Sequence, residues 1–221
     1  MQPTPPVEST NFIIAAFQGG SWGMIPIAIV MVFVIFIIFE RYMTLSRMSV
    51  DKKDFNDKLF GFILRGDIRQ AITFCDSRPA PLTNTLKAGL VQVLNRRPDE
   101  EVQVAMDGAA LKEVPVLDGW TGFLAVFGNV ATLLGLLGTI VGLIHSFRAV
   151  TNADPAQKAT LLSSGIAEAM NCTAFGLIVA IPAIIAYGYY QTRTQRIVND
   201  MNESSMNLMN LIVANRDKIK D

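Results

Sequence analysis

The sequence has few of the residues that build metal clusters, disulfide frameworks or charged binding surfaces. It holds two cysteines and one histidine in 221 residues, too few for a structural zinc cluster or a set of disulfides. Only 17% of the residues are charged, and the 19 basic and 19 acidic side chains cancel. A soluble domain of this size usually carries about a quarter charged residues. A neutral chain also argues against nucleic acid as a partner.

Charge is missing from three long stretches. These lie between Glu8 and Glu40, between Asp118 and Arg148, and between Glu168 and Arg193. Each is long enough to cross a bilayer, because roughly 20 apolar residues in a helix span its hydrocarbon core. The apolar runs are continuous rather than alternating, which favours helices over a β-barrel. We therefore predict an all-α integral membrane protein with three transmembrane helices and long cytoplasmic helical extensions.

Basic residues set the expected orientation. No Lys or Arg precedes the first span, whereas basic residues follow the first and third spans. Basic side chains collect on the cytoplasmic side, and the start also lacks the basic region of a signal peptide. The expected segments are 1–21 (N-terminal, extracytoplasmic), 22–39 (first span), 40–118 (cytoplasmic helices), 119–147 (second span), 148–161 (short extracytoplasmic loop), 162–190 (third span) and 191–221 (cytoplasmic C-terminal helix). Glu40 and Arg41 are expected to anchor the first span at the interface.

Apolar residues at helical spacing predict helices in the cytoplasmic region. The spacing holds from Phe55 to Cys75 and again over 82–94, and the intervening Arg78-Pro79-Ala80-Pro81 breaks it. A further helix is expected from Pro98 through Val114. It leads into the second span with a kink at Pro115.

Small and hydroxyl-bearing side chains form one stripe along the second span. The stripe consists of Gly128, Thr132, Gly135, Thr139, Gly142 and Ser146. Steps of three and four residues place all of them on one face of a helix. Such a stripe lets helices pack closely in lipid. The alternative is that Thr132 and Thr139 face a polar conduit, and the spacing alone does not decide between the two.

The third span carries a second small-residue stripe and a carboxylate. The stripe consists of Gly165, Ala169, Gly176, Ala180 and Ala183. Glu168 and Thr173 lie on opposite flanks of it. A carboxylate at membrane depth usually faces a bundle interior or a water-filled path, and desolvation favours its protonated form, so Glu168 is a candidate proton-handling group. The alternative places Glu168 at the outer interface, where it only hydrates or caps the helix start.

The other polar residues of the spans have simpler interpretations. Asn171 is expected to bond a neighbouring helix, and His145 is an interfacial hydrogen-bonding residue or a proton relay. Pro182 should open a backbone carbonyl and kink the third span, for motion or for static reasons. Cys75 and Cys172 are interpreted as small packing residues. Because no nucleophile–base pair or phosphate-binding loop is visible, we expect neither an enzyme nor a bound cofactor or metal.

Two linked motifs resemble a known family. Residues 135–142 (GLLGTIVG), followed by His145-Ser146-Phe147, resemble the second span of the ExbB/TolQ branch of the MotA/TolQ/ExbB proton-channel family. Residues 165–169, 173–177 and 180–183 are similar to that branch's third span, and a weaker cytoplasmic signature lies at 81–82 and 87–90. The strong motifs cover roughly residues 128 to 190, and the three-span layout extends over nearly the whole chain.

The resemblance implies a subunit of a motor in the bacterial inner membrane that is driven by the proton-motive force. In this family five copies typically form a homo-oligomeric ring in the lipid, and two single-span partners resembling ExbD or TolR place helices in its pore. The partner's membrane aspartate carries the proton. On matching positions, Thr139 and Thr173 would line the pore beside that aspartate, and Glu168 would line or gate the outer path. Met170-Asn171-Cys172 departs from the usual apolar stretch, which leaves local packing and hydration open.

Several alternatives stay open at this point. A non-conducting membrane scaffold would explain the glycine stripes but leaves Glu168 without a purpose. Sodium coupling is conceivable, since hydroxyls and a carboxylate also ligate Na⁺. The sequence does not choose among TonB-type uptake, Tol–Pal envelope maintenance and gliding motility. The MotA branch usually lacks this glutamate, which argues against a flagellar stator.

Overall fold

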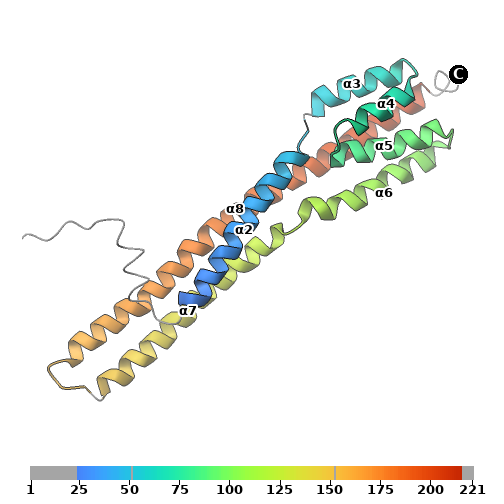
Figure 1. Cartoon of the computed structure of the whole chain (residues 1–221). Coiled ribbons are helices and arrows are strands. Elements are labelled where there is room, and N and C mark those ends of the chain that lie inside the picture. The colour runs from blue at the N-terminus through green and yellow to red at the C-terminus, as the bar shows by residue number, and fades with distance from the viewer. Residues whose placement is uncertain (1–23, 51, 152, 216–221) are drawn as a thin grey trace, which may run out of the picture. The chain divides into compact units, whose positions relative to one another are not determined.

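The computed structural model describes residues 24–50, 52–151 and 153–215. The expected N-terminal segment 1–21, positions 22 and 23 of the first expected span and positions 216–221 of the expected C-terminal helix lie outside these ranges. The described residues form helices and no strands (Figure 1). The helices are α2 (Met24–Met48), α3 (Lys52–Leu64), α4 (Ile68–Asp76), α5 (Pro81–Leu94), α6 (Asp99–Asp118), α7 (Thr121–Thr151) and α8 (Lys158–Ala214).

The expected all-α fold with three spans is confirmed. α2, α7 and α8 are each long and apolar enough to cross a membrane. The chain divides into two compact units. We call the first, Gly122–Tyr187 together with α2 up to Ile38, the membrane unit. The second, Phe39–Thr121 together with 188–215, is the bundle unit.

In the membrane unit, α2 buries one face and exposes the other. The buried side chains recur every three or four residues and are Met24, Ile27, Val30, Val34 and Ile37. Side chains between them, such as Val32 and Phe36, are exposed in the single chain. Phe33 stacks on Phe127 of α7 with ring centroids 5.8 Å apart. A helix that is apolar all round but packs on one face suits lipid on the other.

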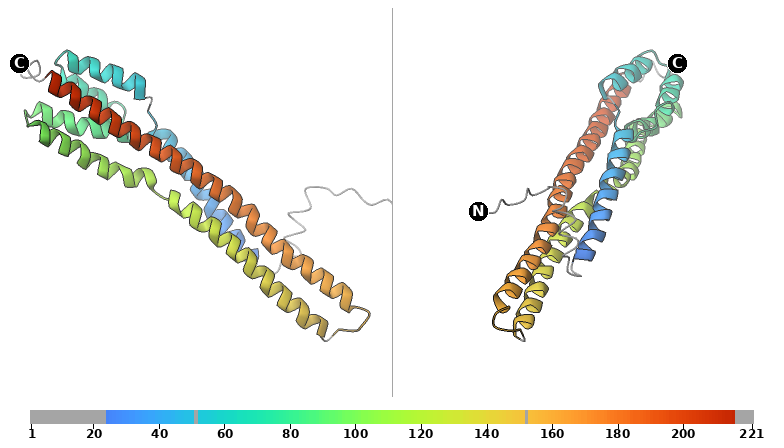
Figure 2. Two further views of the ribbon diagram at one scale, coloured as in Figure 1. Left: turned by 180° about the vertical axis from the view of Figure 1, so that it is seen from behind. Right: turned by 60° about the vertical axis from the view of Figure 1, so that its left-hand side comes forward.

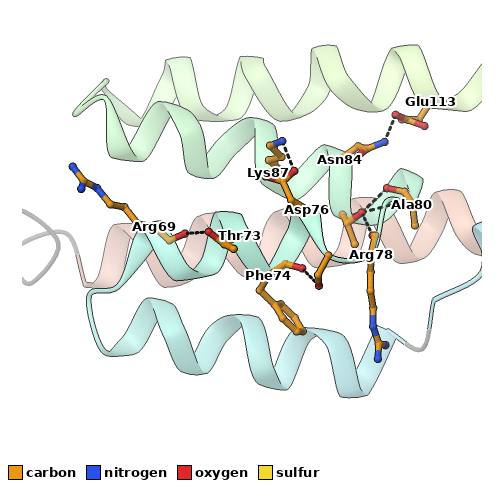
Figure 3. Close-up of polar contacts among 11 residues, drawn as sticks. Arg69, Thr73, Phe74, Asp76, Arg78, Ala80, Asn84, Lys87 and Glu113 are labelled. Atoms are coloured by element: carbon orange, nitrogen blue, oxygen red, sulfur yellow. Dashed lines mark hydrogen bonds and ion pairs between the residues drawn. The ribbon is translucent and has the colours of Figure 1, made fainter.

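The bundle unit has a conventional helical core. Its largest fully buried side chains come from α3, α5, α6 and α8 and are Phe55, Leu59, Ile63, Leu86, Leu90, Met106, Leu117, Met201, Leu208 and Ile212. Phe55 of α3 stacks on Phe74 of α4, with ring centroids 5.0 Å apart. Polar contacts join the outer faces: Lys87 forms an ion pair with Asp76, and Asn84 donates to Glu113 at 2.8 Å (Figure 3).

The apolar pattern from Phe55 to Cys75 is split between two helices. α3 ends at Leu64 and α4 begins at Ile68. Gly66 lies between them with φ of 78°, a left-handed conformation that glycine adopts without a Cβ clash. The carboxylate of Asp67 then accepts a hydrogen bond from the backbone N–H of Gln70 at 3.1 Å and caps α4.

The junction before α7 differs from the expected kink at Pro115. α6 continues through Pro115 and ends at Asp118, and the break comes at Gly119, whose φ is 40°. The N–H of Gly119 donates to the carbonyl of Pro115 at 2.9 Å, which closes the last turn of α6. Glycine tolerates this left-handed φ and proline does not require a break so close to a helix end, so the chain turns at the glycine.

α7 and α8 extend beyond the expected spans. α7 runs to Thr151 and α8 begins at Lys158, which leaves a shorter connection than the expected loop 148–161. α8 continues without interruption through Pro182 to Ala214. The expected extension of the third span into a C-terminal helix is thus present over the residues that the structure describes.

Candidate functional site

α7 and α8 meet along a seam where their backbones nearly touch, and they lie side by side in both views of Figure 2. A Cβ placed on Gly176 of α8 would lie 2.7 Å from the carbonyl oxygen of Ala131 in α7. A Cβ placed on Gly135 of α7 would lie 3.1 Å from the carbonyl oxygen of Cys172. Both glycines are buried. Glycine at these two positions is therefore what permits the close approach.

The seam includes most members of the two predicted stripes. Gly128 packs against Ala183 and Ile184, Gly142 against Ala169, and Gly165 against the side chain of Ser146. Gly138, which lies beside the stripe, contacts the buried free thiol of Cys172. Close packing thus extends over the whole antiparallel pair.

Thr132 is the stripe residue that the seam does not cover. Its side chain is exposed in the single chain, and its hydroxyl donates to the carbonyl of Gly128 in the previous turn at 3.2 Å. Asn129, also in α7, is likewise exposed. Asn129 was not among the predicted site residues, although an amide within an apolar span is a signal that could have identified it.

The structure brings Thr139 and Thr173 together at the centre of the seam. Their hydroxyls form a hydrogen bond with each other. Thr139 Oγ1 also lies 3.1 Å from the carbonyl oxygen of Gly135 and 3.2 Å from that of Ala169. Thr173 Oγ1 lies 3.2 Å from the same Gly135 carbonyl. Two helices thus place two hydroxyls and two carbonyls around one point.

The number of donors around this point is smaller than the number of acceptors. Each hydroxyl has one proton to donate and two lone pairs to accept with. The two protons serve the carbonyls or the other hydroxyl, so lone pairs on both oxygens stay available. Thr139 and Thr173 are half-buried rather than enclosed. The pair can therefore accept a hydrogen bond from a water or from a protonated carboxyl group that approaches the membrane unit.

Glu168 lies apart from the threonine pair. It precedes Ala169, which is buried in the seam, so its side chain is turned by about 100° from the contact line. Glu168 is half-buried, and it makes no hydrogen bond or ion pair with the residues that the structure describes. Asn171 is half-buried one turn further along the same side of α8, and His145 of α7 is exposed.

Arg41, which together with Glu40 was expected to anchor the first span at the interface, is buried within the chain. The residue is 4% exposed and lies inside the bundle unit. Its guanidinium donates to the Glu40 carboxylate at 2.7 Å and to the carbonyl of Leu117 at 3.4 Å. The hydroxyl of Thr194 donates to the same carbonyl at 3.4 Å. The arginine therefore ties the ends of α2 and α6 together, close to Gly119.

Comparison with known proteins identifies the family. The sequence model of the MotA/TolQ/ExbB proton channel family matches residues 77–203, more than half of the chain. The chain belongs to this family. The matched segment contains all of α7 and the seam with α8.

Individual relatives belong to the TolQ and ExbB branch of the family. The Tol-Pal system protein TolQ of Pseudomonas aeruginosa is 39% identical over 99 residues, which are 45% of this chain and 42% of that protein. TolQ of Haemophilus influenzae is 40% identical over 98 residues, 43% of this chain and 42% of the relative. The biopolymer transport protein ExbB of Pseudomonas putida is 32% identical over 97 residues, 44% of this chain and 29% of the relative. The matches thus span about two-fifths or less of these relatives' length. Together with the three apolar helices, they support an inner-membrane protein.

Proposed function

We propose that this chain is the channel and stator subunit of a motor driven by the proton-motive force. Five copies form a ring in the inner membrane, and two single-span partners of the ExbD/TolR kind stand in its pore. The motor energises envelope transport, envelope maintenance or motility. The observation that carries the proposal is the bonded pair of Thr139 and Thr173, which lies on two of the apolar helices within the family-matched segment and keeps free lone pairs.

The hydroxyl pair would act on a partner carboxyl group. A protonated carboxyl donates a hydrogen bond to a threonine oxygen, whereas an ionised carboxylate accepts one, and a threonine hydroxyl serves both states. Neutralisation removes the cost of moving the charge past an apolar wall, which allows one step of the partner relative to the ring. The membrane potential supplies about 2.3 kcal/mol per charge for each 100 mV, so a few protons deliver useful work.

Glu168 would serve the outer part of the path. A carboxyl group at membrane depth is stable only where protein or water covers it. Its half-buried side chain in the single chain fits a position that a neighbouring subunit, the partner or a water-filled entry completes. The orientation that we propose places the N-terminus in the periplasm and the C-terminus in the cytoplasm, in agreement with the basic residues after α2 and within α8.

Valine substitutions at the threonine pair test the proposal. Thr139→Val and Thr173→Val keep the shape of the side chain and remove the hydroxyl. Thr132→Val makes the same change on α7 at a hydroxyl that bonds only to its own helix, so it is the matched control. We expect the double variant to lose motor output while its ring assembles, and the control to keep output. Near-normal output from the assembled double variant would refute the proposed role.

A non-conducting scaffold is the second candidate. Two observations favour it: the hydroxyls of Thr139 and Thr173 already have backbone carbonyls as hydrogen-bond partners, and glycines let α7 and α8 pack closely along the seam. Glu168→Gln and Glu168→Ala separate the two functions, because a scaffold needs no ionisable group there. Loss of output with an intact ring supports ion handling, and full output in both variants supports the scaffold. Measuring transport under a proton gradient and under a sodium gradient separately identifies the coupling ion.

A further inference from the structure

Two adjoining hollows lie along α8 in the bundle unit, and residues of α2 line one of them. The smaller, about 120 Å³, is lined by Tyr42, Leu45, Ser46, Tyr189, Tyr190 and Arg193. The larger, about 350 Å³, is lined by Gly188, Tyr189, Thr192, Arg193 and Arg196. Because Tyr189 and Arg193 line both, the hollows form one groove, which we call the tyrosine–arginine groove.

The groove is positively charged. Arg193 and Arg196 contribute two guanidinium groups, and no acidic side chain of the described chain lines either hollow. The acids that these two helices carry within the bundle unit are bonded to other cations: Glu40 to Arg41, and Asp200 and Glu203 to Lys52. Arg193 donates one hydrogen bond, to Ser49 at 2.8 Å, and a guanidinium has five N–H donors. The groove can therefore bind an anion.

The groove also lies at the edge of the apolar spans. Along α8 the apolar run ends at Tyr189 and Tyr190, and Arg193 and Arg196 follow within the next two turns. Tyr42 on α2 and Tyr189 on α8 are both 63% exposed, and Phe39, which precedes Tyr42 on α2, is exposed too. In a membrane helix, apolar residues lie in the hydrocarbon core, tyrosines in the headgroup layer and basic residues on the cytoplasmic side. The residues along α8 follow this order. A ligand here meets an apolar wall on one side and cations on the other.

An anionic phospholipid has this two-part chemistry. Its acyl chains suit the exposed apolar flank, and its phosphate suits the arginine fork, which binds phosphate through paired hydrogen bonds. Basic pockets between membrane helices on the cytoplasmic side bind such headgroups. We infer that the tyrosine–arginine groove binds the phosphodiester headgroup of an anionic phospholipid of the cytoplasmic leaflet, phosphatidylglycerol or cardiolipin. A lipid bound there bridges α2 and α8. The inference requires a membrane-spanning chain and is independent of proton transport.

Native mass spectrometry of the full-length protein in detergent tests the inference. Phosphatidylglycerol and phosphatidylcholine are titrated separately onto the delipidated protein. The variants are Arg196→Gln, which changes an exposed side chain, and the Arg193→Gln/Arg196→Gln pair. Arg78→Gln is the matched control, since its exposed side chain reaches into solvent from another part of the bundle unit (Figure 3).

We expect wild-type protein to prefer phosphatidylglycerol over phosphatidylcholine. Arg196→Gln should lower the affinity for phosphatidylglycerol about fivefold, and the pair should lower it further, because each interfacial cation contributes a similar increment. Phosphatidylcholine binding and the Arg78→Gln control should be unchanged. Equal affinities in wild type and the double variant, or an equal loss in Arg78→Gln, would overturn the inference. Complete displacement of the lipid by millimolar inorganic phosphate would also overturn it, because the groove would then be a free-anion site.

Discussion

Gly176→Ala should loosen the α7–α8 seam and lower the stability of the protein. The new methyl group would lie 2.7 Å from the Ala131 carbonyl oxygen, whereas ordinary contacts begin at 3.4 Å. The helices must therefore separate by about 0.7 Å, the difference between these distances, because the atom opposite is backbone and cannot rotate away. Overpacking of a tight interior costs about 1–3 kcal/mol. The higher helix propensity of alanine offsets about 1 kcal/mol of this cost.

We expect Gly176→Ala to lower the free energy of unfolding by about 2 kcal/mol, at the upper end of the range, because the carbonyl oxygen opposite the new methyl group belongs to the rigid backbone. For a chain of this size we expect the midpoint of thermal unfolding to fall by about 4–8 °C. Gly122→Ala is the control on α7, because a Cβ there meets nothing within 4 Å and only the propensity gain applies. Both variants are compared by thermal denaturation of the purified complex in one detergent. If Gly176→Ala unfolds at the same temperature as Gly122→Ala, the seam is not the close contact that the structure describes.

Two further predictions concern the bundle unit. Burial raises the pKa of the Cys75 thiol to about 12, so Cys75 should resist maleimide at pH 8 in the folded protein and react after denaturation; labelling at the same rate in both states would contradict this. Between pH 9.0 and about 12 the thiol of Cys75 ionises in the unfolded protein but stays protonated in the folded protein, so the free energy of unfolding falls as pH rises through this range. The hydrogen bond that Lys52 donates to Glu203, ahead of the one that it donates to Asp200, raises the pKa of Lys52. The ion pairs of Lys52 therefore add to the free energy of unfolding below the ordinary pKa of lysine, and this contribution is lost as pH rises through the raised pKa. Lys52→Met should lower the free energy of unfolding by about 0.2–1 kcal/mol at pH 7 in low salt. Chemical denaturation at high salt should show no difference between the variant and the wild type.

Periodicity predicted the spans and the small-residue stripes because lipid imposes one simple rule on each helix. A span must be apolar over its length, and a close helix contact requires small residues every three or four positions. These rules act locally along the chain, so the sequence alone placed Gly135, Thr139 and Gly176 on the faces that meet in the seam, whereas Thr132 of the same stripe lies outside it. It did not show that Thr139 and Thr173 bond each other, because that requires the register between α7 and α8.

Features that depend on contacts between distant segments could not be predicted. Arg41 looks like any basic residue after a span, and only the carbonyl of Leu117 on another helix explains its burial. The break at Gly119 depends on this contact too, since a Cβ at Gly119 would collide with the Arg41 guanidinium. Pro115 is the stronger local signal for a break, yet α6 continues through it and the chain turns at Gly119, where only the absence of a Cβ leaves room for the Arg41 guanidinium.

Proton flux through the reconstituted complex tests the central claim most directly. Vesicles would contain the full chain with its single-span partner, and a pH-sensitive dye would report proton entry under an applied potential. The account predicts flux in wild type and in Thr132→Val, and a large loss in the Thr139→Val/Thr173→Val double variant with the ring intact. Equal flux in all three proteins, or no flux in wild type, would contradict it.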